Sequence, residues 1–224
     1  YSGIAWMVAK NNMFKIKIAA VAAISLLSCA ALSNVSPSQE SSSDIKPGVL
    51  IGYSYQWLHH SGTIEFYDGQ VTHSVSKESV IPRNMGSTSL AVVFPLTRDW
   101  GIEINYILAD HYKKRSDLVT ISGDTESLYF EVFKRFSLWG KFYMDAIAGA
   151  VVSASDSTMK INQIFPPNQY VDEYSYNSVA IEPNLGLRIS YPISEKWSAG
   201  FGVGHAFGIT PTTDDGTHVK VFVG

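Results

Sequence analysis

Residues 179–191 read Val-Ala-Ile-Glu-Pro-Asn-Leu-Gly-Leu-Arg-Ile-Ser-Tyr, and this stretch decides the fold. Apart from Pro183, its odd-numbered positions carry large apolar side chains, while its even-numbered positions from Ala180 to Ser190 are small or polar. Successive side chains of a β-strand point to opposite faces. The alternation therefore predicts a strand with one apolar and one polar face.

The same period of two recurs along the chain from Gly48 onward. It predicts eight strands, at about 48–57, 88–96, 100–109, 128–136, 140–152, 179–191, 198–204 and 217–224. Most of these reach the ~9–11 residues of a tilted membrane-spanning strand, whereas strands of soluble proteins average about 5–6 residues.

The connections alternate in length as well. Short turns are expected at 97–99, 137–138 and 194–196, and long polar loops at about 59–85, 111–125, 153–176 and 209–216. Tight periplasmic turns and extended extracellular loops are typical of outer-membrane barrels. We therefore predict an all-β fold, an eight-stranded antiparallel up-and-down transmembrane β-barrel.

Composition and charge agree with this prediction. The chain is 46% hydrophobic and only 17% charged, with 17 Lys and Arg against 20 Asp and Glu. This fraction of hydrophobic residues is too high for a disordered chain. A net charge of −3 provides no basic surface for phosphates, so we expect no nucleic-acid partner.

The N-terminal segment has the order basic, apolar, small that a secretory signal peptide requires. We expect upstream or non-native residues at 1–12, before Met13, then a signal peptide at 13–33, a Ser-rich periplasmic lead at 34–47 and the barrel at 48–224, whose last strand is expected to be truncated. Cys29 is the only cysteine. It is either the lipidated residue of a lipobox, as Leu-Leu-Ser-Cys suggests, or a small residue of the signal peptide, and both remain open.

Aromatic residues flank the short turns. Residues 94–100 (Phe-Pro-Leu-Thr-Arg-Asp-Trp) match residues 191–197 (Tyr-Pro-Ile-Ser-Glu-Lys-Trp). Tyr and Trp prefer the membrane–water interface. The expected interface aromatics are Trp57, Phe94, Trp100, Phe136, Trp139, Tyr191 and Trp197.

A soluble ligand-binding barrel with ordinary hairpin aromatics is the alternative. It would turn four residues into a dry core that a membrane barrel turns outward: Ile51, Ile102, Leu185 and Phe201.

With its signal peptide, its eight strands from Gly48, its aromatic-flanked turns and the strand ending Leu185–Pro192, the chain resembles the small outer-membrane β-barrels of Gram-negative bacteria, the group of outer-membrane proteins A, X and W. The resemblance implies export to the outer membrane. It also implies the lipid bilayer and the barrel-assembly machinery as partners. We expect a monomer.

The polar face should line the lumen. An eight-stranded barrel is just wide enough for side chains to fill it, so we expect an ionic network that plugs it. Its expected members are Glu103, Glu131, Arg135, Lys141, Asp145, Glu182 and Arg188.

The predicted role is structural, or surface interaction through the extracellular loops. The first loop reads as a hairpin over 63–75, and residues 164–170 form either a packed loop or a contact patch. An alternative is lateral uptake of small hydrophobic molecules.

A lipid A-modifying enzyme is a weaker alternative. His205 shares the lipid-facing phase, but the residue two positions later is Phe207 and not the serine that such a site requires. His59 and His60 are adjacent and point to opposite faces, while His73, His111 and His218 are expected to be solvated. We therefore predict no enzyme, no metal site and no cofactor.

Overall fold

The computed structural model describes residues 45–60, 62–67, 71–109, 111–162, 173–208 and 215–224. The expected signal peptide at 13–33, residues 1–12, Cys29, the lead before Ile45 and the segment 164–170 lie outside these residues. The elements are β1 (Gly48–His59), β2 (Thr63–Tyr67), β3 (Thr72–Ser76), α2 (Lys77–Val80), β4 (Asn84–Pro95), β5 (Trp100–Ala109), β6 (Tyr112–Arg115), β7 (Val119–Ser137), β8 (Tyr143–Ile161), β9 (Glu173–Pro192), β10 (Ser198–Ala206) and β11 (Asp215–Val223).

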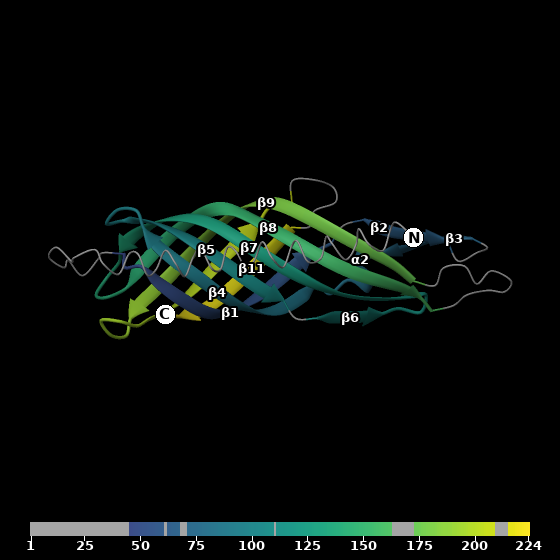
Figure 1. Ribbon diagram of the computed structural model, residues 1–224, viewed down its shortest axis with the longest axis horizontal. Coiled ribbons are helices and arrows are strands. Elements are labelled where there is room, and N and C mark those ends of the chain that lie inside the picture. Colours follow the sequence, from purple (N-terminus) through teal and green to yellow (C-terminus); the bar gives the residue numbers. More distant parts are fainter. Residues whose placement is uncertain (1–44, 61, 68–70, 110, 163–172, 209–214) are drawn as a thin grey trace, which may run out of the picture.

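Eight of these strands form a closed antiparallel barrel, as the alternation predicts (Figure 1). Neighbours follow the order β1, β4, β5, β7, β8, β9, β10 and β11. The first and last strands pair with each other, from Ile51 opposite Val223 to His59 opposite Asp215. β6 pairs with β7 beyond the end of β5.

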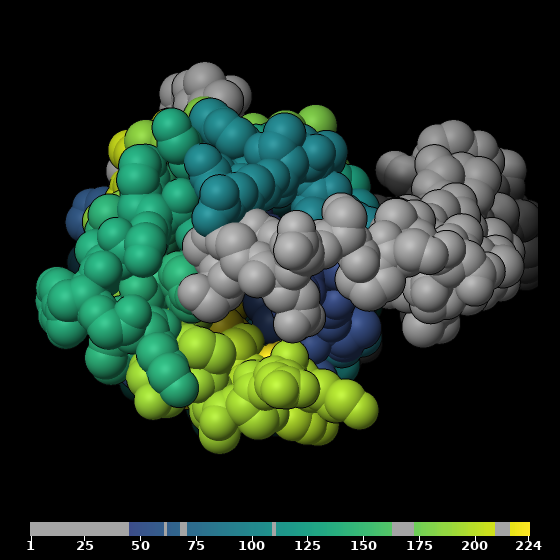
Figure 2. Space-filling view, turned by 90° about the vertical axis from the view of Figure 1, so that its left-hand side faces the viewer, coloured from purple at the N-terminus to yellow at the C-terminus, as the bar shows by residue number. Residues whose placement is uncertain are grey.

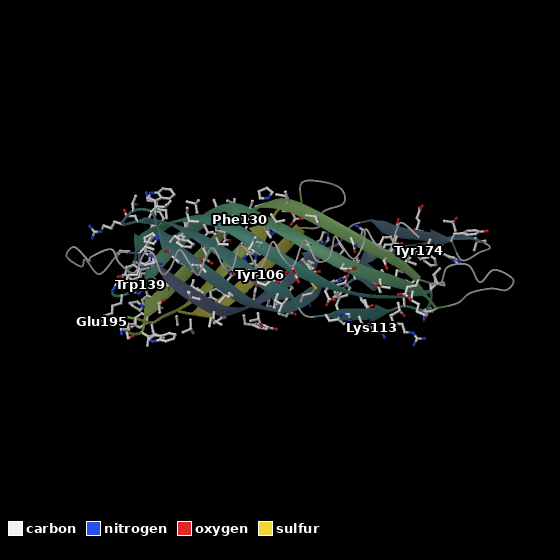
Figure 3. All side chains as sticks on the ribbon, viewed as in Figure 1. Tyr106, Lys113, Phe130, Trp139, Tyr174 and Glu195 are labelled. Carbon is white, nitrogen blue, oxygen red and sulfur yellow. The ribbon has the colours of Figure 1, made fainter. Side chains whose placement is uncertain are left out.

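Most outward-facing side chains of the barrel are apolar, while the inward-facing ones include most of the buried polar and charged residues. Ile51, Leu185 and Phe201 are 62%, 54% and 49% exposed, and Ile102 shares their outward phase, since Glu103 beside it is buried. All four therefore face outward, which contradicts the soluble alternative. Figure 3 shows the side chains on the outside of the barrel. We call the exposed apolar residues of the barrel strands the apolar belt; they include Ile51, Leu90, Val132, Ile181, Leu185, Leu187, Phe201, Val203 and Val221. Within the described ranges, no helix is long and apolar enough to cross a membrane.

Three short turns lie at one end, the turn end, and ring its rim in Figure 2. The middle turn covers residues 138–142 and is longer than expected. Gly140 adopts a φ of +64°, and the Leu138 N–H donates to the Phe142 carbonyl at 2.9 Å. Because the turn is longer, β8 begins only at Tyr143. Trp139 therefore lies in the turn, where it is 74% exposed.

The opposite end, the loop end, differs from the expectation. Residues 111–125 and 153–176 were expected as loops, but much of both ranges is strand, because β7 and β8 stay paired from Ser137 opposite Tyr143 to Val119 opposite Ile161. In both ranges, frequent Ser and Thr residues obscure an alternation of apolar residues. Buried apolar residues of β7 and β8 form a separate core with residues of the β2–β3 hairpin and α2. The members of this core are Phe66, Val75, Val80, Val119, Ile121, Met159 and Ile161.

The expected hairpin is present, since β2 and β3 pair from Thr63 opposite Ser76 to Tyr67 opposite Thr72. It contributes Phe66 and Val75 to the separate core. Lys114 Nζ donates to the carbonyl oxygens of Glu78 at 3.0 Å and Ile81 at 3.1 Å. These contacts attach the segment after the hairpin to β6.

Candidate functional site

The strand register places three charged residues in one row across β7, β8 and β9. Arg135 is the Cα partner of Asp145, which is the Cα partner of Arg188. Arg135 donates Nε to Asp145 Oδ1 at 2.8 Å and Nη2 to Oδ2 at 3.0 Å. Arg188 donates Nε to Oδ2 at 2.9 Å. The fully buried carboxylate is thus held between two guanidinium groups, which offsets the cost of burying its charge.

Two further charges join from other strands. Arg188 Nη1 donates to Glu103 Oε2, and this contact spans the lumen because Glu103 lies on β5. Lys220 on β11 places Nζ 3.6 Å from Glu103 Oε1. Gly202 is the Cα partner of both Arg188 and Lys220 and leaves room between the two cations. We call the group the lumen network: Glu103, Arg135, Asp145, Arg188 and Lys220.

Aromatic rings pack against the lumen network. Phe133 is fully buried, and its ring centroid lies 4.8 Å from the Arg188 guanidinium carbon and 5.8 Å from that of Arg135. The Phe222 ring lies 5.4 Å from Arg188. A desolvated cation–π contact contributes about 2 kcal/mol. The two rings thus pack directly against the cations of the lumen network.

A second buried carboxylate is held by an amide. Glu131 is opposite both Glu103 and Gly149, and Gly149 is opposite Asn184. Asn184 Nδ2 donates to Glu131 Oε1 at 2.6 Å. A Cβ at position 149 would press on the Phe130 carbonyl and lie 2.9 Å from Glu131 Cα. The glycine therefore allows β9 to reach across β8 toward β7.

The structure brings together only part of the expected group. Glu103, Arg135, Asp145 and Arg188 belong to the lumen network. Glu131 and Glu182 are buried on inward faces, outside the network. Lys141 was expected in the lumen, but β8 begins only at Tyr143, so this lysine lies exposed in the turn.

Lys220 is the member that sequence reasoning missed. A signal was present, because Val219, Val221 and Val223 define the outward face of the last strand and place Lys220 on the opposite face. Asn184 carries no such distinctive signal, since its contact with Glu131 depends on three-dimensional neighbours.

The expected interface aromatics occur near both ends of the apolar belt. Near the turn end lie Phe94, Trp100, Phe136, Trp139, Tyr191 and Trp197. Trp57 lies near the loop end of β1, where its ring centroid is 4.8 Å from that of Tyr55. Phe142, which was not expected among them, joins the group 5.0 Å from Tyr191.

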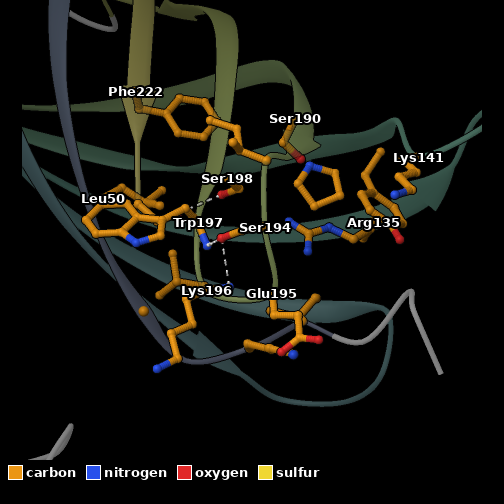
Figure 4. A pocket seen from close by; sticks show the side chains of 18 of the residues that line it. Leu50, Arg135, Lys141, Ser190, Ser194, Glu195, Lys196, Trp197, Ser198 and Phe222 are labelled. Atoms are coloured by element: carbon orange, nitrogen blue, oxygen red, sulfur yellow. Dashed lines mark hydrogen bonds between the residues drawn. The ribbon is translucent and has the colours of Figure 1, made fainter. Parts of the chain in front are cut away.

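Two cavities lie at different levels of the barrel and share no lining residue. The turn-end cavity, about 640 Å³, is lined by residues that include Arg135, Trp197 and Phe222 (Figure 4). The loop-end cavity is about 370 Å³. On β11 the first contains Phe222 and the second His218, with Lys220 between them. Lys220 of the lumen network thus lies between the two cavities along β11.

One histidine that was expected to be solvated is buried. His218 was expected to be solvated, but it is 6% exposed and meets the Tyr129 ring edge-on at a centroid distance of 5.4 Å. It shares the inward phase of Lys220. His60 is buried as well, with Nε2 2.9 Å from the Pro82 carbonyl oxygen.

His205 contacts a hydroxyl on the neighbouring strand. Its Nδ1 lies 2.9 Å from Thr217 Oγ1, and its ring packs 4.5 Å from that of Phe207. Among the described residues, no carboxylate is recorded against this imidazole, and no group of three His, Cys, Asp or Glu residues has the arrangement of a metal site. The pair therefore lacks the third group that orients a catalytic base.

No protein-family model matches the chain, and no curated protein does either. Solved structures do resemble it. Ail, the attachment invasion locus protein of Yersinia pestis, has 11% identity and a TM-score of 0.50, over 80% of this chain and 95% of that one. The chain has the fold of the small outer-membrane β-barrels of Gram-negative bacteria. Neisserial surface protein A (11%, TM-score 0.46, covering 80% and 97%) and OprG from Pseudomonas aeruginosa (10%, 0.44, covering 80% and 92%) are further similar barrels.

Proposed function

We propose that this outer-membrane barrel is closed by its lumen network and acts through its loop end, as a surface-interaction protein. The observation that supports this role most directly is the separate core at the loop end. There β7, β8 and β9 continue well past the end of β10, and the β2–β3 hairpin packs against them. A rigid scaffold that presents loops is the usual arrangement for binding.

The hairpin offers a contact surface. Tyr67 and Val71 lie near its tip and are 55% and 52% exposed. Both lie at the loop end, beyond the apolar belt, where large apolar side chains meet water. Exposed apolar groups in such a place mark interaction sites, and tyrosine is enriched in protein interfaces.

Exchanging both Tyr67 and Val71 for serine is expected to reduce attachment of expressing cells to protein-coated surfaces. Burying a side chain of this size contributes about 1.5–3 kcal/mol, so the loss should weaken attachment at least roughly tenfold. Attached cells are counted after washing. Ser74→Ala, on the same hairpin, is the matched control and should attach like the parent chain. Equal attachment by the double variant would show that the hairpin is not the contact.

Surface exposure is checked in the same cells with a membrane-impermeant maleimide. Ser74→Cys should react on intact cells, whereas Glu195→Cys in a short turn should react only after the outer membrane is opened. The parent chain supplies the background, because its only cysteine is Cys29.

A closed lumen predicts no steady conductance. Purified protein in a planar bilayer should leave the current at baseline, because buried ion pairs and the packed Phe133 ring block the level between the cavities. Arg188→Ala is the comparison, since it removes the central cation and should open conducting events. Stable conductance by the parent chain would contradict the closed lumen.

The proposal also covers membrane embedding, assembly, oligomeric state and catalysis. The apolar belt is suited to the lipid bilayer, and its flanking aromatics to the headgroup region. Assembly by the barrel-assembly machinery and a monomeric state are proposed with it. The His205–Thr217 pair lacks an orienting carboxylate among the described residues, which favours a role without catalysis. We also propose that the barrel works without a cofactor.

A further inference from the structure

We infer that the loop-end cavity is a binding site for a small, neutral saccharide or polyol. This goes beyond the proposed surface interaction and does not depend on it. The cavity, about 370 Å³, falls in the range of about 300–1,000 Å³ that small-molecule sites occupy.

Small residues create this space. At the level of the lumen network the barrel is filled by large side chains, but many of the residues that β7, β8 and β9 contribute to the cavity wall are small. The small lining residues are Thr125, Ser127, Ser153, Ser155, Ser157, Ser178 and Ala180. Several hydroxyls meet, with Ser127 Oγ 3.0 Å from Ser153 Oγ and Tyr112 Oη 2.8 Å from Ser157 Oγ. A wall of hydroxyls can both donate to and accept from a ligand.

Two polar side chains line the cavity from neighbouring strands. Gln56 and His218 are Cα partners on β1 and β11, and they are 8% and 6% exposed. The Gln56 amide offers a donor and an acceptor, and so does a neutral imidazole at His218. A molecule that fills the cavity must replace the water at these two groups, so it should itself carry donors and acceptors.

The other lining residues define the class of ligand. The buried Tyr129 ring lines the cavity and offers an aromatic face for the C–H side of a sugar ring. Lys77 and Glu182 are of opposite sign, so the lining does not favour a charged ligand. Apolar side chains such as Leu58, Met85 and Ile121 also line the cavity, so the ligand should present C–H surface as well as hydroxyls. A purely apolar molecule would displace water from Gln56 and His218 without replacing its hydrogen bonds, which is costly. A neutral saccharide has both kinds of surface.

Ligand-observed NMR on the detergent-solubilised full chain tests the inference. The probes are methyl glucoside, N-acetylglucosamine and sucrose, with glucuronate and glucosamine as charged counterparts and cyclohexylmethanol as the apolar one. We expect saturable binding of at least one neutral saccharide, and weaker binding of the charged and apolar probes. Gln56→Leu should weaken saccharide binding about tenfold, because it removes the amide but keeps the shape.

Neighbouring positions on β8 supply a matched pair of variants. Ser155→Phe fills the cavity and should abolish binding, while Ala154→Phe places the same ring on the outward face and should bind like the parent. Heat-modifiability on a gel confirms that each variant is folded. The inference is overturned by no saturable saccharide binding, by unchanged binding in a folded Ser155→Phe variant, or by tighter binding of cyclohexylmethanol than of every saccharide.

Discussion

Replacing Arg188 with leucine is expected to destabilise the folded barrel by about 3–5 kcal/mol, the usual cost of removing one partner from a buried ion pair. Arg188 is 4% exposed and donates to both Glu103 and Asp145. Without it, Glu103 retains only Lys220, at 3.6 Å. The measurement is the urea midpoint of unfolding in detergent or vesicles, followed by tryptophan fluorescence.

The triple variant Glu103→Leu, Arg188→Leu and Lys220→Leu distinguishes pairing from packing, because it removes Glu103 together with both of the cations beside it. Apolar replacement of a whole buried ionic group is often neutral, and Arg135 still binds Asp145 in this variant. The triple variant should therefore regain at least about half of the lost free energy of unfolding. A triple variant as unstable as the single one would show that Arg188 acts through its packing on Phe133.

A charge on the apolar belt should be almost as damaging. Leu187 is 49% exposed on the outward face of β9, and about 17 Å of strand separates it from the last residue of β9, Pro192. Leu187→Arg should lower the free energy of unfolding in vesicles by about 2–4 kcal/mol, as for a charge near the bilayer midplane. The same urea titration measures it.

Ile193→Arg is the matched control. Ile193 is even more exposed than Leu187, at 61%, but it lies in the turn after β9. Near an interface the same substitution costs about 0–1 kcal/mol. Equal costs at the two positions would argue that this outer surface does not face lipid.

The barrel itself could be predicted from sequence because its signal is local. In residues 179–191 every outward side chain is apolar and every inward one is small or polar. The loop end was harder to predict, since Ser153, Ser155 and Ser157 look like loop residues. Only the pairing of β8 with β7 and β9 shows that they line a cavity.

The lumen network, too, could be predicted only in part, because some of its contacts depend on residues far apart in the sequence. The inward phase of Asp145 and Arg188 follows from their own strands. That Arg188 also reaches Glu103 depends on the width of the lumen, which no single strand encodes. Lys141 has the same phase as the inward Asp145 but was misplaced, because the turn centred on Gly140 delays the start of β8 to Tyr143.

The row of Arg135, Asp145 and Arg188 also acts as a check on assembly. If β8 slipped by one residue against its neighbours, Asp145 would turn toward lipid, Arg135 would lose its carboxylate and Arg188 would keep only Glu103 of its two. A slip by two residues would keep it inside but separate it from both partners. Apolar residues on the belt oppose a slip by one residue, which would turn them into the lumen, but they are nearly interchangeable and do not oppose a slip by two. The few charges inside the barrel therefore identify the one correct alignment of its strands during insertion.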